Sequence, residues 1–290
     1  MRRISFIYTT IILALLNINL AIADQYILLY QNLFINEGDK AVNKFQLYLP
    51  IPPEREHQKI SNQTHYPQPS DYLTDKYGQK IAYFEFNNIL PGQTFGMYWI
   101  GDISTSYKEY DIDPNKVSGL ETIPQDIIDV YTRNEEMYSL QSDIIQHAAE
   151  EASAGATNTY WMAKNILNFV NANLTHGGSG GWDNAETVYI NKEGTCSEFT
   201  YLFIALCRAN GLPARYVGGT MKRENMIDTS FHRWAEVYLP PYGWVPFDAQ
   251  TNKFARSRND AFIVSFSGGN SDYLGWADIE QIKKHNMLYD

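Results

Sequence analysis

Gly194-Thr195-Cys196-Ser197-Glu198-Phe199 begins the helix on which the expected fold of this 290-residue chain is built. Thr195 and Glu198 have the Thr-x-x-Glu spacing of a capping box, which places Cys196 at the first helical position. The apolar residues that follow recur at three- and four-residue spacing and predict one buried helix face: Phe199, Leu202, Phe203, Leu206 and Ala209. Asn210-Gly211 is typical of a helix end.

A cysteine at a helix N-terminus has a physical reason to be reactive. The unpaired backbone N–H groups and the helix dipole stabilise an anion there, which lowers the pKa of the thiol. The same N–H groups stabilise an oxyanion on a substrate. Gly194, which has no side chain, lets a substrate approach closely. Cys196 is therefore a candidate nucleophile, although a lone cysteine at a helix start is more often a small buried hydrophobe.

A β-hairpin is predicted at residues 232–248. Residues 232–239 alternate in the manner of a strand, the next four residues are rich in turn formers, and residues 244–248 form the second strand. If Tyr238 pairs with Trp244, Asp248 lies diagonal to His232 on one face, with roughly 7–8 Å between the backbone positions. A register shifted by one residue would separate them. Alone, His232 is more often a structural residue and Asp248 the start of a turn.

Three stretches of the chain resemble the core of the transglutaminase-like superfamily: residues 194–217, 232–240 and 243–248, within a match over about 155–250. The resemblance implies a papain-like fold. It also implies that Cys196 is the nucleophile, His232 the general base and acid, and Asp248 the group that orients the histidine. The family includes protein cross-linking enzymes, peptidases, amidases and members that have lost the cysteine.

The second cysteine, Cys207, contrasts with the first. It follows Cys196 by eleven residues on the same predicted helix, about 16 Å along the axis. Disulfides require Cα atoms within about 7 Å, so the two cysteines are not expected to pair. Cys207 has apolar neighbours and is expected in the core.

Residues 1–23 have the pattern of a secretory signal peptide. Arg2 and Arg3 precede an apolar run over residues 4–16, and Ala21-Ile22-Ala23 is a small-x-small cleavage site. An uncleaved membrane anchor is the alternative, but the run is shorter than the ~20 residues that span a bilayer. We expect export to the periplasm or the medium, with the mature chain beginning near Asp24.

The charge of the mature chain is acidic. Without Arg2 and Arg3, 21 basic residues stand against 33 acidic ones. This balance disfavours nucleic acid and anionic membranes as partners and weakly favours basic or neutral substrates. No stable membrane insertion is expected after signal cleavage.

The mature chain is expected to have an α+β fold in two domains. Residues 24–125 predict a β-sandwich-like domain, with strands at 26–35, 44–49 and 81–86 and with core side chains that include Phe45, Leu47 and Leu49. Its many tyrosines suit either packing or a carbohydrate or peptide surface. Residues 126–290 predict the transglutaminase-like catalytic domain, in which helices pack on an antiparallel sheet.

Two amphipathic helices are expected before the nucleophile. Residues 142–151 have Ile144, Ile145, Ala148 and Ala149 on one side, and residues 158–174 have Trp161, Ile166, Phe169 and Val170. After the hairpin, residues 262–266 and 273–276 are expected to complete the sheet.

The glycine-rich stretch 176–182 resembles a phosphate loop but lacks the Gly-Lys-Ser/Thr ending. We interpret it as a mobile loop near Cys196, with His176 solvated. Trp182 is expected in or beside the cleft, either donating to the oxyanion or packing, and Trp234 is a second candidate for the cleft. No residue cluster has metal-ligand spacing, and no cofactor is predicted.

The expected activity is acyl transfer from a carboxamide or peptide bond through a thioester. We favour hydrolysis by a protease or amidase acting on a protein, a peptide or a cell-envelope polymer. The alternatives are a cross-linking transglutaminase and a non-catalytic envelope-binding module.

Overall fold

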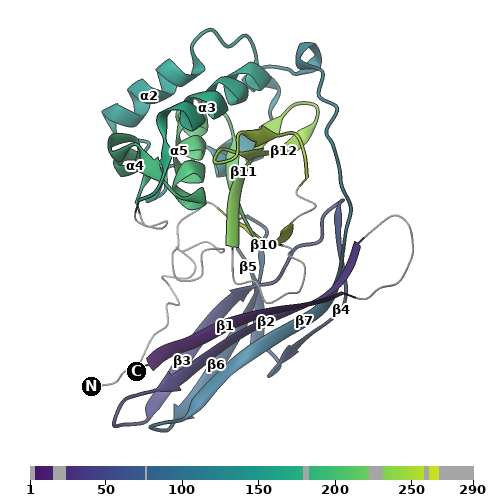
Figure 1. Ribbon diagram of the computed structural model, residues 1–290, viewed down its shortest axis with the longest axis vertical. Coiled ribbons are helices and arrows are strands. Elements are labelled where there is room, and N and C mark those ends of the chain that lie inside the picture. The colour runs from purple at the N-terminus through teal and green to yellow at the C-terminus, as the bar shows by residue number, and fades with distance from the viewer. Residues whose placement is uncertain are drawn as a thin grey trace.

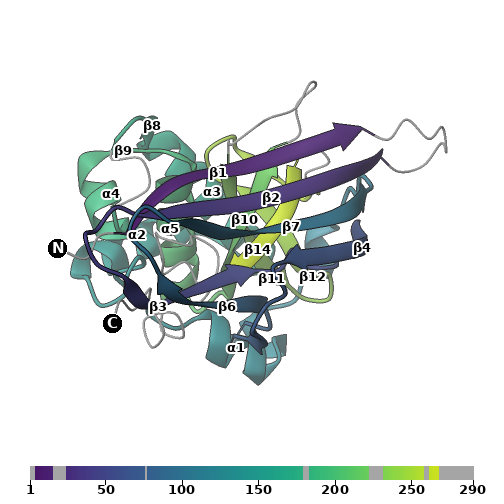
Figure 2. The same ribbon diagram turned by 90° about the horizontal axis from the view of Figure 1, so that it is seen from below.

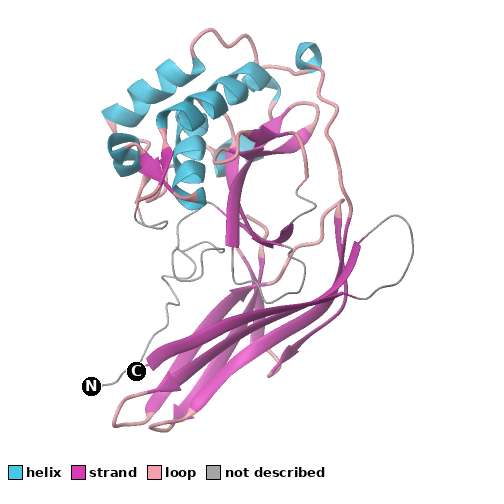
Figure 3. Ribbon diagram, in the orientation of Figure 1, coloured by secondary structure: helices cyan, strands magenta, loops and turns pink. Residues whose placement is uncertain are grey.

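The computed structural model describes residues 4–15, 24–75, 77–178, 183–221, 231–257 and 261–267. Its N-terminal part is built of strands, and helices gather in its C-terminal part (Figures 1 and 3). The N-terminal strands form a four-stranded sheet of order β1-β2-β7-β4 and a three-stranded sheet of order β3-β6-β5. Their bounds are β1 Ile4–Leu15, β2 Asp24–Asn36, β3 Val42–Pro50, β4 Gln58–Tyr66, β5 Asp71–Thr74, β6 Lys80–Ile89 and β7 Thr94–Thr105.

The two sheets enclose one apolar core, as the sequence predicts. Phe45, Leu47 and Leu49 on β3 are all buried, since alternate residues of a strand face one side of its sheet. Phe34 of β2 and Phe95 of β7 pack on Phe45, each with ring centroids 5.0 Å apart. Aromatic packing between facing strands therefore holds the sandwich together.

Strand β1 belongs to the predicted signal peptide. It pairs antiparallel with β2, from Ile4 opposite Asn36 to Leu15 opposite Tyr26, and it is the outer strand of its sheet. Removal of residues 1–23 would therefore leave β2 at the sheet edge. Cleavage and export stay predictions. Among the described helices, none is both long and apolar enough to span a membrane.

Five α-helices are described in the C-terminal part. Their bounds are α1 Gln125–Tyr131, α2 Asp143–Ser153, α3 Thr159–Asn173, α4 Ala185–Asn191 and α5 Cys196–Ala209, and short 3-10 turns at η1 Pro114–Lys116 and η2 Leu120–Thr122 precede them. Helices α2 and α3 match the two predicted amphipathic helices.

The predicted inward faces of α2 and α3 were each wrong at one residue. Ile144 is 38% exposed and Trp161 is 43% exposed. The face that α2 buries is centred on Ile145 and Ala148, and Ile144 lies one residue, or about 100°, away from Ile145. In α3 the buried face is centred on Ile166, which turns Trp161 toward solvent.

Helix α5 is buried on every side, whereas the sequence predicted one apolar face. All residues from Ser197 to Arg208 are buried because α2, α3, α4 and the sheet surround the helix. Two of its buried polar side chains donate to backbone carbonyls: the Thr200 hydroxyl to Cys196 at 2.7 Å, and the Arg208 guanidinium to Ala214, outside the helix. The helix ends at Ala209, and Asn210 is its C-cap, as the Asn210-Gly211 pair predicts.

The C-terminal sheet is antiparallel with the order β13-β12-β11-β10-β14. Its strands are β10 Ala214–Met221, β11 Phe231–Leu239, β12 Gly243–Asp248, β13 Lys253–Phe254 and β14 Ala261–Ser267. Strand β14 adds to the sheet beside β10, as predicted for residues 262–266, and residues 273–276 lie outside the described ranges. A short parallel pair joins β8 Thr175–His176 to β9 Glu193–Gly194.

Strand β14 also joins the two parts of the molecule. Phe262 is fully buried in the sandwich core, and the side-chain amide of Gln58 on β4 exchanges two 2.8 Å hydrogen bonds with the backbone of Ile263. Figure 2 shows the sandwich strands crossing in front of β10 and β14. The sandwich is therefore packed directly against the sheet that carries the predicted hairpin.

Candidate active site

The capping box forms as the sequence predicts. The Glu198 carboxylate accepts the backbone N–H of Thr195 at 2.5 Å and the Thr195 hydroxyl at 2.8 Å. Cys196 is the first residue of α5 and is partly exposed. Position 194 also has no room for a side chain, because a Cβ on Gly194 would lie 2.7 Å from the Cβ of Glu198. The capping geometry thus requires glycine two residues before the thiol.

The hairpin has the predicted register. Tyr238 pairs with Trp244 across β11 and β12, which puts Asp248 and His232 on the same face. The Nε2 atom of His232 lies 2.8 Å from Oδ2 of Asp248, and the side chains are 11% and 6% exposed. Oδ1 of Asp248 accepts the backbone N–H of Thr251 at 3.1 Å. Both carboxylate oxygens are therefore engaged.

The thiol of Cys196 lies within hydrogen-bonding reach of His232. Because Nε2 of the ring faces Asp248, Nδ1 is the nitrogen left to face the sulfur. Burial by itself raises the pKa of the Cys196 thiol. The hydrogen bond from His232, the charge of Arg233 and a hydrogen bond from the Arg233 backbone outweigh burial, and the pKa is lowered below its ordinary value. The arrangement suits a thiolate nucleophile beside an oriented imidazole.

Trp234 lies under the histidine. Its ring is nearly parallel to that of His232, with centroids 6.1 Å apart and an interplanar angle of 22°, and it is only 2% exposed. Gly219, opposite His232 on β10, makes room for this indole, because a Cβ there would approach the ring to 2.8 Å. Trp234 therefore contacts the site by packing against the imidazole of His232. Because it is buried, it does not line an open cleft.

The start of the glycine-rich loop runs beside the nucleophile, as the sequence predicts. The Gly177 N–H donates to the Gly194 carbonyl at 3.0 Å, next to the β8–β9 pair. His176 is exposed, as expected. Trp182 lies outside the described residues, so its predicted place in the cleft stays a prediction.

Arg233 and Tyr216 also lie near the thiol and were not predicted from the sequence. Arg233 lies close enough to act on the thiol through its charge, and Tyr216 is within hydrogen-bonding reach of Arg233 and Ser197. The strand alternation at residues 232–239 was the available signal. It puts Arg233 on the same face as Ala235, which is buried against α5.

Cys207 is fully buried and is not disulfide-bonded, as the sequence predicts. Burial raises the pKa of the Cys207 thiol far above its ordinary value. Within the described ranges, no group of three or more His, Cys, Asp or Glu residues is arranged to hold a metal ion.

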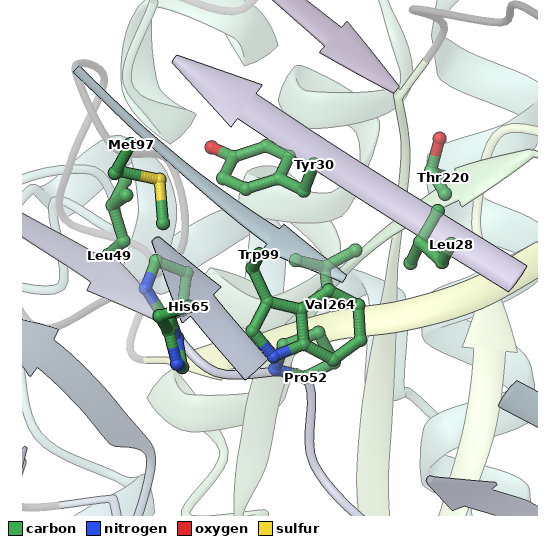
Figure 4. A pocket seen from close by; sticks show the side chains of 10 residues that line it. Leu28, Tyr30, Leu49, Pro52, His65, Met97, Trp99, Thr220 and Val264 are labelled. Atoms are coloured by element: carbon green, nitrogen blue, oxygen red, sulfur yellow. The ribbon is translucent and has the colours of Figure 1, made fainter. Parts of the chain in front are cut away.

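A small cavity lies apart from the site, where the sandwich meets β10 and β14 (Figure 4). Leu28, Met97 and Trp99 give it an apolar lining, to which His65 and Thr220 add polar groups. Burial lowers the pKa of His65 to about 4, so the imidazole is neutral at pH 7. Cys196, His232 and Asp248 are not among the lining residues, so the cavity is separate from the candidate site.

A family comparison covers the part of the chain that carries the candidate site. Residues 146–249 match the model described as the Transglutaminase-like superfamily. This confirms the resemblance inferred from the sequence over about 155–250. A stretch of 73 residues is 32% identical to the uncharacterized protein YebA of Bacillus subtilis strain 168; it covers 21% of this chain and 10% of that protein. The chain thus spans about a tenth of that relative's length.

A solved structure confirms the α+β fold. It is described as a "putative cysteine protease" from Cytophaga hutchinsonii and superposes with a TM-score of 0.62 at 20% identity, covering 92% of this chain and 84% of that one. Red sea bream transglutaminase gives a TM-score of 0.34 at 13% identity, over 78% of this chain and 48% of that one. The N-terminal sandwich and the helix-and-sheet part are both included in the Cytophaga match.

Proposed function

We propose that this chain is a thiol hydrolase that cleaves a carboxamide or peptide bond through a thioester on Cys196. The observation that carries the proposal is the 2.8 Å contact between His232 and Asp248, with the Cys196 thiol within reach of the same imidazole. Each of these side chains has a more common structural role when it occurs alone. Their convergence on one point, from α5, β11 and β12, favours catalysis.

The first half of the reaction forms the thioester. The Cys196 sulfur, having given its proton to His232, attacks the carbonyl carbon, and the oxyanion is held by backbone N–H groups at the start of α5. The C–N bond then breaks, and His232 gives its proton to the leaving amine or ammonia. Asp248 keeps Nε2 of the imidazole occupied, so that Nδ1 exchanges protons with the sulfur.

The second half releases the acyl group. Water gives a proton to His232 and attacks the thioester carbon, the C–S bond breaks, and the free acid leaves. We favour water over an amine as the acceptor because nothing in the sequence specifies an amine site. The description of the Cytophaga neighbour as a "putative cysteine protease" points the same way. The proposed substrate is a protein or peptide, or a cell-envelope polymer, met after export.

One experiment distinguishes a hydrolase from a cross-linking enzyme and from a non-catalytic module. The reduced full chain is incubated with a glutamine-containing protein and a labelled primary amine, beside its Cys196→Ser variant. Hydrolysis predicts release of ammonia or new peptides by the wild type alone, without label in the protein. Incorporated label would make the chain a cross-linking enzyme. If no product forms and the thiol titrates near the ~8.5 of a free cysteine, the chain is a non-catalytic module.

A further inference from the structure

A groove of about 430 Å³ lies between the edge strands of the sandwich. Strand β4 is the outer strand of one sheet and β5 is the outer strand of the other, and both line the groove together with the loop that joins them. The volume falls within the roughly 300–1,000 Å³ of small-molecule sites. Cys196, His232 and Asp248 are not among the lining residues, so the groove is separate from the candidate active site.

Neutral polar side chains line most of the groove. Gln63 and Thr64 of β4, Gln68 of the loop and Thr74 of β5 contribute amides and hydroxyls and are all exposed. His65 of β4 also lines the groove, and burial lowers the pKa of its imidazole to about 4, so the ring is neutral at pH 7. These groups form hydrogen bonds without carrying charge.

Charged side chains are scarce in the groove. Among the described residues that line it, Lys80 is the one that is ionised at pH 7, and none is a carboxylate. A site for a basic peptide is expected to present carboxylates, and a site for a polyanion is expected to present several cations. The lining therefore fits an uncharged ligand, although the chain as a whole has a net charge of −10.

Two of the amides are oriented by hydrogen bonds within the sandwich. Oε1 of Gln63 accepts the indole N–H of Trp99, and Nε2 of Gln68 donates to the His65 carbonyl, each at 3.3 Å. Nε2 of Gln63 and Oε1 of Gln68 can then bond to a ligand, one as a donor and the other as an acceptor. A sugar hydroxyl both donates and accepts, so the pair of amides suits a saccharide.

Tyr72 of β5 adds an exposed aromatic ring to the groove. It is 55% exposed, and its ring packs edge-to-face on buried His65 with centroids 5.9 Å apart and an interplanar angle of 68°. A sugar ring has an apolar face of C–H groups and a rim of hydroxyls. The apolar face packs on an aromatic ring while the rim meets the amides. A ring already held by His65 loses little further freedom on binding.

The two strands are poor templates for an added peptide strand. The register of β4 with β7 shifts between Ser61 and Thr64, and Asn62 in this bulge has a φ of 50°. Strand β5 has only four residues, Asp71–Thr74. Bulges and short strands are features that protect a sheet edge from further pairing. Recognition by side chains is therefore favoured over strand addition.

We propose that the groove between β4 and β5 binds a neutral oligosaccharide. One sugar packs its C–H face on Tyr72, and its hydroxyls bond to the amides of Gln63 and Gln68. The sandwich thus holds a glycan on a part of the molecule separate from Cys196. The inference goes beyond the proposed hydrolysis and does not depend on it, because binding uses none of the groups of the candidate active site.

The test measures binding to the full chain by titration calorimetry. The probes are neutral hexasaccharides of glucose, mannose, galactose and N-acetylglucosamine, and every chain carries Cys196→Ser so that no thiol chemistry intervenes. We expect at least one probe to bind, Tyr72→Ala to weaken that binding about tenfold, and Gln68→Leu to weaken it about fivefold. Tyr72→Phe keeps the ring and should retain most of the affinity. The matched control is Tyr107→Ala, since Tyr107 is 50% exposed and does not line the groove.

Thermal unfolding shows whether each variant folds. Because Tyr72 and Gln68 are exposed, both variants should unfold near the temperature of the parent chain. Gln68→Leu tests the groove if Tyr72→Ala does not fold.

Three results would overturn the proposal. One is that none of the four hexasaccharides binds. Another is that a probe binds with the same affinity to the parent, Tyr72→Ala and Gln68→Leu, which would place the sugar elsewhere. The third is that unstructured peptides compete at the groove and the sugars do not, which would make it a peptide site.

Discussion

The guanidinium of Arg55 and the carboxylate of Glu236 join the sandwich to the strand that carries His232. Nη2 of Arg55 lies 2.8 Å from Oε1 and 2.6 Å from Oε2, and Arg215 on β10 donates to Oε2 from the other side at 2.8 and 2.5 Å. The three side chains are 18%, 5% and 6% exposed in the order Arg55, Glu236, Arg215. The ion cluster therefore ties the sandwich to β11 four residues beyond the histidine.

Replacement of Glu236 should destabilise the chain strongly. Glu236→Gln leaves the buried guanidinium of Arg215 and the partly buried guanidinium of Arg55 without their charged partner. Breaking a buried pair costs about 3–5 kcal/mol. Urea unfolding at pH 7 measures the loss. The matched control is Glu109→Gln, whose pair with Arg256 is about 60% exposed and should contribute less than about 1 kcal/mol. Equal, small losses in both variants would contradict this view of the cluster.

The same ion cluster should make the free energy of unfolding depend on pH in the acidic range. Burial raises the pKa of Glu236, but Arg55 and Arg215 outweigh it and lower the pKa to about 2, against an ordinary 4.5. Because the folded value is the lower one, the contribution is complete above pH 4.5 and is lost as the pH falls from about 4.5 to about 2. Glu236→Gln should therefore show a shallower loss of unfolding free energy across this window than the wild type. Parallel curves for the two chains would count against it.

Gly219→Ala should disturb the site through packing. A Cβ at this position would lie 2.4 Å from the Phe262 carbonyl oxygen and 2.8 Å from the Trp234 ring, on which His232 is stacked. We expect a loss of about 1–3 kcal/mol in stability and a changed pH profile of Cys196 alkylation. Gly92→Ala is the control. Its added Cβ would meet no atom within 4 Å, so only the backbone strain at a φ of +75° remains. It should lose about 1 kcal/mol and leave the alkylation profile unchanged.

The two cysteines should differ in accessibility. Alkylation of the native, reduced chain at pH 7 should modify Cys196 alone, because Cys207 is fully buried and its thiol pKa is raised. Mass spectrometry of peptides identifies the modified residue. Addition of denaturant should expose Cys207 to the same reagent. Modification of both thiols at one rate in the native chain would show that α5 is not buried as described.

Asp248→Asn should reduce hydrolysis while the fold persists. An asparagine keeps an oxygen for the Thr251 N–H, but it removes the negative charge beside Nε2 of His232. We expect kcat to fall by about 100-fold or more, within the range of general acid–base catalysis, with little change in KM. Asp126→Asn, at an exposed position on α1, is the control. Unchanged kcat in Asp248→Asn would remove Asp248 from the mechanism.

Much of the candidate site could be predicted from local patterns. The Thr195–Glu198 spacing predicted where α5 begins, because a capping box uses groups three residues apart. Strand alternation with a compact turn predicted that His232 and Asp248 share a face, because the side-chain period of a strand is two. Apolar alternation likewise predicted the burial of Phe45 in the sandwich.

By itself, the sequence determined the starts of elements, the faces of strands and the spacing of the reactive groups, because these depend on backbone geometry within a few residues. Only the tertiary structure decided which element covers each face. It brought Arg233 and Tyr216 to the thiol, turned Trp161 outward, and set Arg55 against Glu236 across 181 residues. Periodicity shows which face of its own helix or strand a side chain occupies. Which residues that face then contacts depends on how distant segments pack together.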